Sequence, residues 1–274
     1  MPEGFCGDDA RERLRCTFDQ VASLYDRARP NYPEQLFDDL FAVGNLGPGA
    51  MVLEIGCGTG QASRSLARRG CRLHCVELGE RLAEIARRNL AEFPLVDVAT
   101  ASFDTWEPPR VDFDMVFAAN AWHWLDPSTR YGKAVRLLKP GGLLALVTGG
   151  HAFPKDFDPF FTEIQKCYDS IGESVGKWPP PLPEEIPDEH QAIEDSGLFE
   201  DVRVRRYLWA VDYTADSYID LLNTYSGHIA MSKAKRDVLY AEIRERISAR
   251  PIGYIRKHYL SLLHMARLRG LTMG

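Results

Sequence analysis

Short apolar runs alternate with amphipathic segments over the first 150 residues of the chain. The apolar runs have the length of buried strands, and the segments between them repeat their apolar positions at the helical period. We expect strands at 51–55, 72–77, 95–99, 113–118 and 143–148, and helices at 61–69, 79–93 and 128–138. Strands and helices that alternate in this way form βαβ units with right-handed crossovers, so the pattern predicts a parallel sheet covered by helices.

The pattern changes after Gly150. A helix is expected to begin after Pro159, and the run WPPPLPEEIP that follows at 178–187 is expected to be a stiff loop, because proline fits neither a helix interior nor a central strand. The later elements are a helix ending at Gly197, a strand at 202–213, helices at 216–225 and 233–248, and a last strand at 254–267. We expect the helices at 160–175 and 216–248 to form a cap over the strand ends.

The run VLEIGCGTG at 52–60 is the most informative local pattern, because an apolar strand ends there in three alternating glycines. Glycine permits positive φ and removes the Cβ atom, which lets a ligand lie against the main chain. The dinucleotide-binding fingerprint spaces its glycines as GxGxxG, whereas this chain has Gly56, Gly58 and Gly60, with Gln61 where the last glycine of that fingerprint should stand. The spacing therefore disfavours a nicotinamide dinucleotide at this turn.

Two acidic residues accompany the glycine loop. Glu54 stands two positions before the first glycine, and Glu77 ends the next apolar strand. A carboxylate at a strand end can accept hydrogen bonds from both hydroxyls of a ribose, and NAD enzymes also place such an acid there. Together with the GxGxG spacing, a strand that ends in Glu77 resembles the class I S-adenosylmethionine (SAM) methyltransferases.

Three further motifs extend this resemblance to residues 18–150. FDQVASLYDRARPNYP at 18–33 is similar to the N-terminal segment of the type 11 or trans-aconitate methyltransferase-like group. FDMVFAANAWHWLDP at 113–127 resembles the fourth strand of that group and its following turn, and LLKPGGLLALV at 137–147 resembles the fifth strand. The resemblance implies an α/β fold with a doubly wound, mostly parallel seven-stranded Rossmann-like sheet, an antiparallel last strand and a helical cap.

The pattern and the resemblance together divide the chain into six parts. They are an N-terminal helical segment that closes over the cofactor (1–44), the SAM-binding core (45–150), a cap helix with the proline-rich loop (151–190), a core strand (191–213), cap helices (214–252) and the final edge strand (253–274).

Composition limits the possible partners and compartments. The chain has 274 residues, of which 45% are hydrophobic, so it can bury one substantial core. Its net charge of -6 argues against a nucleic-acid partner. No apolar stretch has the length of a membrane span, and the first twenty residues lack the apolar block of a secretory signal. We therefore expect a cytoplasmic protein without a membrane partner. The sequence does not distinguish a monomer from a homodimer.

The six cysteines are expected to be reduced thiols rather than a disulfide framework. One short segment contains three side chains of types that ligate zinc, those of Cys71, His74 and Cys75. On a strand, however, positions 71 and 75 share one face while position 74 takes the other, and no second ligand pair accompanies them. The sequence therefore predicts core packing here and no metal site.

The resemblance implies a donor site made of several loops at the strand ends. Glu77 is expected to bind the ribose, Glu54 to brace the glycine loop or bind the amino group of SAM, and Asn120 with Arg29 to orient its amino acid end. Ser102 stands where many relatives carry an acid near the adenine, so Phe103 is expected to pack on the ring, with Asp104 as a substitute acid. The expected cofactor-binding residues are Tyr25, Arg29, Glu54, Gly56, Cys57, Gly58, Thr59, Gly60, Gln61, Glu77, Leu78, Ser102, Phe103, Asn120, Ala121 and Trp122.

Methyl transfer from a sulfonium is an in-line displacement, which mainly requires that donor and acceptor are aligned and water is excluded. A base helps only where the acceptor carries a proton. His123 and Tyr25 are the candidates for catalysis, although relatives with different acceptors share the His-Trp pair, which favours a role of His123 in shaping the SAM site. The expected acceptor-side residues are Trp124, His151, Tyr225 and His228.

The sequence therefore predicts a methyltransferase that acts on a small molecule with SAM as cofactor and S-adenosylhomocysteine (SAH) as product. A protein of this fold that binds SAM without methyl transfer, such as a cyclisation catalyst or a sensor, remains an alternative. A nicotinamide-dependent oxidoreductase is less favoured by the glycine spacing. The sequence does not predict the acceptor or whether O, N or C is methylated.

Overall fold

The computed structural model describes residues 18–108, 111–173 and 178–270, with a seven-stranded sheet at the centre. The strands are β1 (Met51–Ile55), β2 (Arg72–Glu77), β3 (Val96–Thr100), β4 (Phe113–Ala119), β5 (Leu138–Ala152), β6 (Phe199–Thr214) and β7 (Tyr254–Leu268). Their order is β3-β2-β1-β4-β5-β7-β6. Strands β1 to β5 pair in parallel, whereas β7 is antiparallel to β5 and β6, which confirms the predicted fold class.

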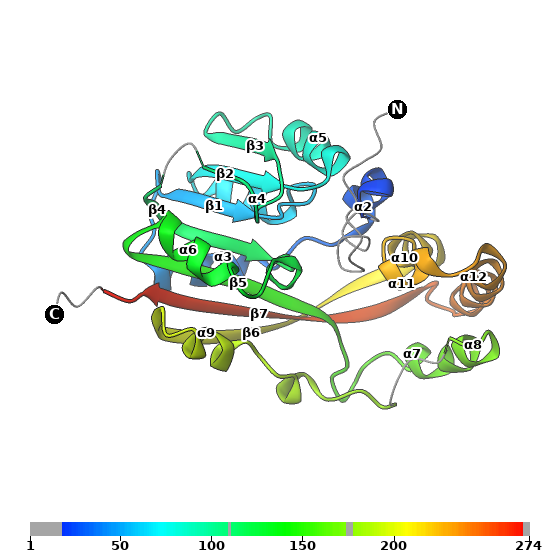
Figure 1. The fold of residues 1–274 in the computed structure, drawn as a ribbon. Helices are drawn as coiled ribbons and strands as arrows, with labels where there is room; N and C mark the ends of the chain where they lie inside the picture. Colours follow the sequence, from blue (N-terminus) through cyan, green and yellow to red (C-terminus); the bar gives the residue numbers. More distant parts are fainter. Residues whose placement is uncertain (1–17, 109–110, 174–177, 271–274) are drawn as a thin grey trace.

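Helices cover both faces of the sheet, and a separate group lies beyond its end (Figure 1). The helices are α2 (Ala22–Ala28), α3 (Glu34–Gly44), α4 (Gln61–Arg68), α5 (Glu80–Asn89), α6 (Arg130–Leu137), α7 (Phe160–Glu163), α8 (Gln165–Ser170), α9 (His190–Asp195), α10 (Ala215–Leu222), α11 (Ser226–Ala230) and α12 (Lys233–Ser248). Short 3-10 turns span Trp122–Trp124 and Pro183–Glu185.

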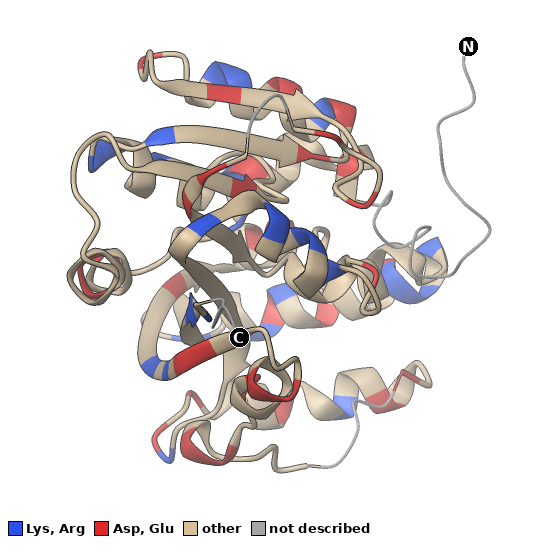
Figure 2. Ribbon diagram, turned by 60° about the vertical axis from the view of Figure 1, so that its left-hand side comes forward, with Lys and Arg blue, Asp and Glu red and all other residues tan. Residues whose placement is uncertain are grey.

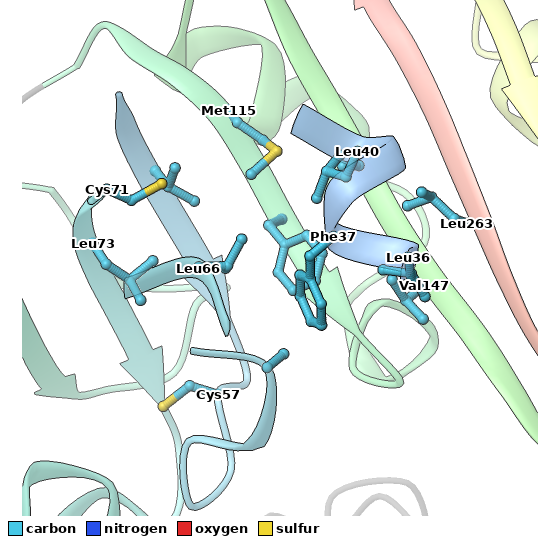
Figure 3. Packing of buried hydrophobic residues seen from close by; sticks show 14 of the residues in the cluster. Leu36, Phe37, Leu40, Cys57, Leu66, Cys71, Leu73, Met115, Val147 and Leu263 are labelled. Atoms are coloured by element: carbon cyan, nitrogen blue, oxygen red, sulfur yellow. The ribbon is translucent and has the colours of Figure 1, made fainter. Parts of the chain in front are cut away.

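Apolar side chains of α3 and α4 hold one helical layer to the sheet (Figure 3). Phe37 and Leu66 have no exposed surface and pack with Met115 of β4. On the opposite face, Ala134 and Leu137 of α6 fill a second cluster. Complete burial of a side chain such as Leu or Phe contributes roughly 1.5–3 kcal/mol, so these two layers fix the parallel strands and the loops at their ends.

The last three strands of the sheet are much longer than the others. Strands β5, β6 and β7 have 15, 16 and 15 residues, and the cap packs on their extension. The predicted strand at 143–148 was too short, because pairing with β7 keeps β5 extended through its glycines to Ala152. This is a tertiary contact that local propensity does not encode.

The cap differs in detail from the prediction. The single helix expected at 160–175 is divided at Ile164 into α7 and α8, and residues 174–175 lie outside the described residues. The helix expected at 216–225 ends at Leu222, and Tyr225 is extended, with φ -90° and ψ 130°, before α11. The helix expected at 79–93 ends at Asn89.

Positions of Lys and Arg alternate with positions of Asp and Glu along the helices and strands in the view of Figure 2. No helix among the described residues is long and apolar enough to cross a membrane.

The cysteines in the described residues, Cys57, Cys71, Cys75 and Cys167, are buried free thiols, whereas Cys6 and Cys16 lie outside the described residues. Cys71 and Cys75 belong to the core, and the imidazole of His74 contacts the Asp97 carboxylate at 2.6 Å. The described residues contain no group of three or more His, Cys, Asp or Glu side chains arranged to hold a metal ion.

Candidate functional site

A cavity of about 500 Å³ lies at the carboxyl ends of the parallel strands and continues under the cap. Ligands of open α/β sheets bind at this edge, where the strand order reverses between β1 and β4. The predicted donor-site residues in its wall are Tyr25, Arg29, Glu54, Gly56, Cys57, Gly58, Gln61, Glu77, Leu78, Phe103, Asn120 and Ala121. His123 and the predicted acceptor-side residues Trp124, His151, Tyr225 and His228 are there too.

Four predicted donor-site residues do not line this cavity: Thr59, Gly60, Ser102 and Trp122. Thr59 is buried and accepts a hydrogen bond from Gln61 at 2.7 Å. Trp122 is only 2% exposed and packs edge-on against Tyr131, 5.2 Å between ring centroids. The 3-10 turn therefore directs Trp122 into the core and its neighbour Trp124 toward the cavity.

The glycine loop has the backbone geometry that its sequence indicates. Gly56, Gly58 and Gly60 have φ values of +67°, +58° and +96°. A Cβ atom on Gly56 would lie 2.5 Å from the Cβ of Ala121, so only glycine fits between the β1 and β4 loops. The backbone beside the cavity is thus free of side chains where a ligand can approach it.

Glu77 joins β2 to the glycine loop. Its carboxylate accepts hydrogen bonds from the backbone N–H of Gly58 at 2.8 Å and of Gly79 at 2.9 Å. Burial raises the pKa of this carboxyl, while the backbone hydrogen bonds oppose the rise. A carboxylate offers about four lone-pair positions, so Glu77 can brace the loop and still accept hydrogen bonds from a ligand.

Glu54 is 1% exposed and lies in the cavity wall beneath the loop. The Cys75 thiol donates to its carboxylate at 3.7 Å, and burial raises the pKa of Glu54 to about 7. We expected Glu54 to brace the loop or to bind the amino group of the donor. The hydrogen bond to the Gly58 backbone is made by Glu77, and the contact of Glu54 with the amino group of the donor stays a prediction.

The raised pKa of Glu54 predicts a pH-dependent stability. Because the folded-state pKa of about 7 exceeds the ordinary value of 4.5, the ligand-free protein should lose stability as pH rises from about 4.5 to about 7. Replacing Glu54 with Gln should raise the free energy of unfolding at pH 8 by about 2 to 3 kcal/mol and have little effect below pH 4.5. Urea unfolding of the unmodified protein and of Glu54→Gln at pH 4.5, 7 and 8 measures this difference. The prediction would be refuted if the free energies of unfolding of the two proteins changed with pH in the same way.

Asn120 follows β4 in the left-handed conformation, with φ +51°. Its backbone N–H donates to the carbonyl oxygen of Val147 at 2.7 Å, and its side-chain amide donates to the Tyr32 hydroxyl at 3.1 Å. Tyr32 lines the cavity and was not predicted, because its position depends on the packing of the N-terminal segment across the strand ends. These contacts hold Asn120 beside the glycine loop.

The adenine side of the predicted donor site contains Leu78 and Phe103. Phe103 is 3% exposed, and its backbone carbonyl accepts a hydrogen bond from Lys133 at 2.6 Å. Asp104, the expected substitute for an acid at Ser102, lies outside the cavity wall and accepts a hydrogen bond from the Asp126 backbone at 3.3 Å.

Arg29 connects the N-terminal segment to the cap. Its guanidinium donates to the Thr224 hydroxyl at 2.8 Å and to the Thr224 carbonyl at 2.9 Å. It lies 5.0 Å from the Tyr25 ring centroid and 4.6 Å from that of Tyr225. Cation–π contacts of this kind hold the rings of Tyr25 and Tyr225 against the guanidinium of Arg29. Burial raises the pKa of Tyr25, so its phenol is a hydrogen-bond donor rather than a base at neutral pH.

His123 is exposed at the cavity mouth, and its ring centroid lies 4.8 Å from that of Trp124. Partial desolvation lowers the pKa of His123, so its imidazole is neutral at pH 7. Trp124 also contacts Phe18, a cavity residue of the N-terminal segment that was not predicted, with 6.0 Å between ring centroids.

His228 lies deep in the cap, at 8% exposure. Its two ring nitrogens are each 3.2 Å from a tyrosine hydroxyl, those of Tyr168 and Tyr240. Burial lowers the pKa of His228 to about 4, so the imidazole is neutral and one tyrosine donates to it while the other accepts. These bonds fix the His228 ring in the cavity wall, and its contact with an acceptor stays a prediction.

The cap side of the cavity also includes residues of β6 and β7 that were not predicted. They are Trp209 on β6 and Lys257, Tyr259 and Ser261 on β7. The alternation of positions 257, 259 and 261 is a strand signal that could have placed them on one face. Only the tertiary structure shows that this face opens into the cavity.

The comparisons with known proteins agree with this geometry. Residues 52–142 match the family model described as a methyltransferase domain. An uncharacterized methyltransferase of Mycobacterium bovis is 30% identical over 141 residues, which are 50% of this chain and 54% of that protein. This chain thus aligns with about half the length of the curated relatives that it matches first.

Two solved structures have a similar fold. A protein of Anaeromyxobacter dehalogenans, proposed to be a type II methyltransferase, is 25% identical, with a TM-score of 0.63 over 88% of this chain and 99% of that one. Haemonchus contortus phosphoethanolamine N-methyltransferase 2, in complex with phosphomonomethylethanolamine and SAH, is 18% identical, with a TM-score of 0.56 over 96% of this chain and 61% of that one. The narrower trans-aconitate methyltransferase-like group stays a prediction. The matched domain and the fold together support a class I SAM-dependent methyltransferase.

Proposed function

We propose that this protein transfers the methyl group of SAM to a small molecule held under the helical cap. The observation that supports this most strongly is the continuity of one cavity from the glycine loop and Glu77 to the aromatic residues of the cap. A donor and an acceptor that share one cavity can be aligned for in-line methyl transfer, and the cap over the cavity limits the access of water.

In this proposal, each donor contact follows from a described position. Glu77 accepts from the ribose hydroxyls, and Leu78 and Phe103 enclose the adenine. Glu54 faces the amino group of SAM, and its carboxylate becomes ionised when that cation binds. SAH bound to the Haemonchus enzyme of the same fold agrees with this choice of cofactor.

Asn120 and Arg29 are proposed to orient the carboxylate end of the donor. Asn120 stands at the end of β4 beside the loop, and Arg29 brings a positive charge to the same region while it joins the N-terminal segment to the cap. We propose that this segment, including α2, closes over the cofactor. The aromatic walls from Trp124, Tyr225 and Trp209 then exclude water from the acceptor.

The test is a metabolite-library screen that detects SAH release, followed by mass spectrometry of the product made from methyl-labelled SAM. The proposal predicts a labelled product from at least one small-molecule acceptor. If SAM binds but no library member is ever labelled, while one is converted without methylation, the protein uses SAM without methyl transfer.

We expect His123 to position the site rather than to act as a general base. Replacing it with Ala should lower kcat less than tenfold and leave the pH profile unchanged, because the imidazole is exposed and packs mainly on Trp124. Steady-state kinetics with the acceptor found in the screen measure both quantities. A loss of about 100-fold or more, together with loss of a titration at acidic pH, would identify His123 as the base.

A further inference from the structure

The cavity continues beyond the donor site along one face of β7. Ser261 pairs with Gly149 and Tyr259 pairs with His151 across the antiparallel ladder, and Lys257 follows two residues further along the same face. The four residues from Ser261 to Lys257 along β7 span roughly 13 Å. The backbone of Lys257 is therefore far from Gly149, which pairs with Ser261. It lies further along β7 than Tyr259 and Ser261, toward the cap.

Lys257 is a buried lysine without a counter-charge. Its side chain is 2% exposed, and its Nζ lies 5.1 Å from the ring centroid of Tyr259 and 5.6 Å from that of Phe161. Among the residues that the structure describes, no hydrogen bond or ion pair reaches this ammonium. Two aromatic faces offset only part of the cost of burying an ammonium, which is large when the charge is unpaired.

The charges around Lys257 do not supply the missing partner. The acids in the described cavity wall are Glu54 and Glu77, and both belong to the donor half. Arg29 adds a second positive charge, and both it and the burial of Lys257 lower the pKa of Lys257. Asp158, the buried acid of the cap, is engaged by Arg250 at 2.9 Å and by a backbone N–H.

We propose that Lys257 binds an oxyanion on the methyl acceptor, at the end of the molecule opposite to the atom that is methylated. The acceptor is then an elongated small molecule with a carboxylate or a phosphate ester at one end. Its apolar middle packs against Trp209 and Tyr259, and its methylated atom lies beside Asn120 and Gly149, on the order of 10 Å from the anion. This inference rests on the proposed function, because it assigns the acceptor half of the same cavity.

Calorimetric titrations of SAH-saturated protein test the inference before the natural acceptor is known. The probes are 3-phenylpropionate, the neutral amide of the same acid, and 2-phenylethyl phosphate. One or both anions should bind at least tenfold more tightly than the amide, and the tighter anion shows whether carboxylate or phosphate is preferred. The difference should disappear in Lys257→Met, which keeps a long apolar side chain in the same space.

Lys166→Met is the matched control, because Lys166 is an exposed lysine of the cap helix α8 outside the cavity wall. It should retain the preference for the anions, and both variants should bind SAH within twofold of the unmodified protein. Thermal unfolding verifies that Lys257→Met is folded, and Lys257→Gln is the second variant for the same titrations.

Three results would overturn the inference: equal affinity for the acid and its amide, no saturable binding of either anion, or an anion preference that survives in the folded Lys257 variants. The comparison of acid and amide in the unmodified protein decides the first two without any variant. Failure to bind SAH at all would overturn the proposed function instead. SAH binding without any anion preference overturns only the assignment of Lys257.

Discussion

Replacing Glu77 with Ala is expected to weaken SAM binding by at least about 100-fold. The substitution removes the proposed acceptor of two ribose hydroxyl hydrogen bonds, and hydrogen bonds to a charged group contribute about 1.5–3 kcal/mol each. It also frees the backbone N–H of Gly58, which the carboxylate holds at 2.8 Å. Both losses weaken the binding of SAM, and each 1.4 kcal/mol of lost binding free energy lowers the affinity tenfold. Isothermal titration of SAM measures the change.

Glu80→Ala is the control, because Glu80 is an exposed acid three residues later, in the first turn of α5. It should bind SAM within twofold of the unmodified protein. Thermal unfolding separates loss of the fold from loss of the site. An affinity of folded Glu77→Ala within threefold of the original value would remove Glu77 from the donor site.

Gly149→Ala is expected to have the largest effect on stability, with a loss of about 3 kcal/mol or more. A Cβ atom at this position would lie 2.0 Å from the carbonyl oxygen of Leu260, on the neighbouring strand β7. Gly149 also has a φ of +155°, which side chains of L-residues rarely adopt. Relief of the clash requires the backbone pairing of β5 with β7 to separate, and this pairing forms the floor of the cavity. Urea unfolding measures the loss.

The adjacent glycine provides a close control. A Cβ atom on Gly150 would meet nothing within 4 Å, so Gly150→Ala should change the free energy of unfolding by less than about 1 kcal/mol. Equal stabilities of the two variants would mean that β5 and β7 do not approach each other as described. The pair therefore tests the strand register that brings Ser261 and Lys257 into the cavity.

Local sequence patterns were sufficient to predict the glycine loop and the strand end beside it. Gly56 and Gly58 follow a buried strand and adopt positive φ, and Glu77 ends the next strand beside them, as expected of neighbouring parallel strands. These features depend on residues close in sequence or on the parallel pairing of β1 with β2. The sequence could therefore predict them with the βαβ pattern alone.

The acceptor half could not be predicted in the same way. Lys257 and Trp209 reach the cavity only because β6 and β7 extend past the parallel strands and the cap folds back on them. Trp122 was expected to bind the cofactor, but it does not line the cavity, and its ring packs in the core against Tyr131. Side-chain direction within a turn and contacts between distant strands depend on tertiary packing, which one-dimensional spacing does not specify.

The most direct test of the central claim is a calorimetric titration of SAM into the purified protein, with NAD titrated under the same conditions. The account predicts saturable heat from one SAM site per chain, competition by SAH and no saturable heat from NAD. Absence of binding by SAM and SAH, or binding by NAD in their place, would contradict the account.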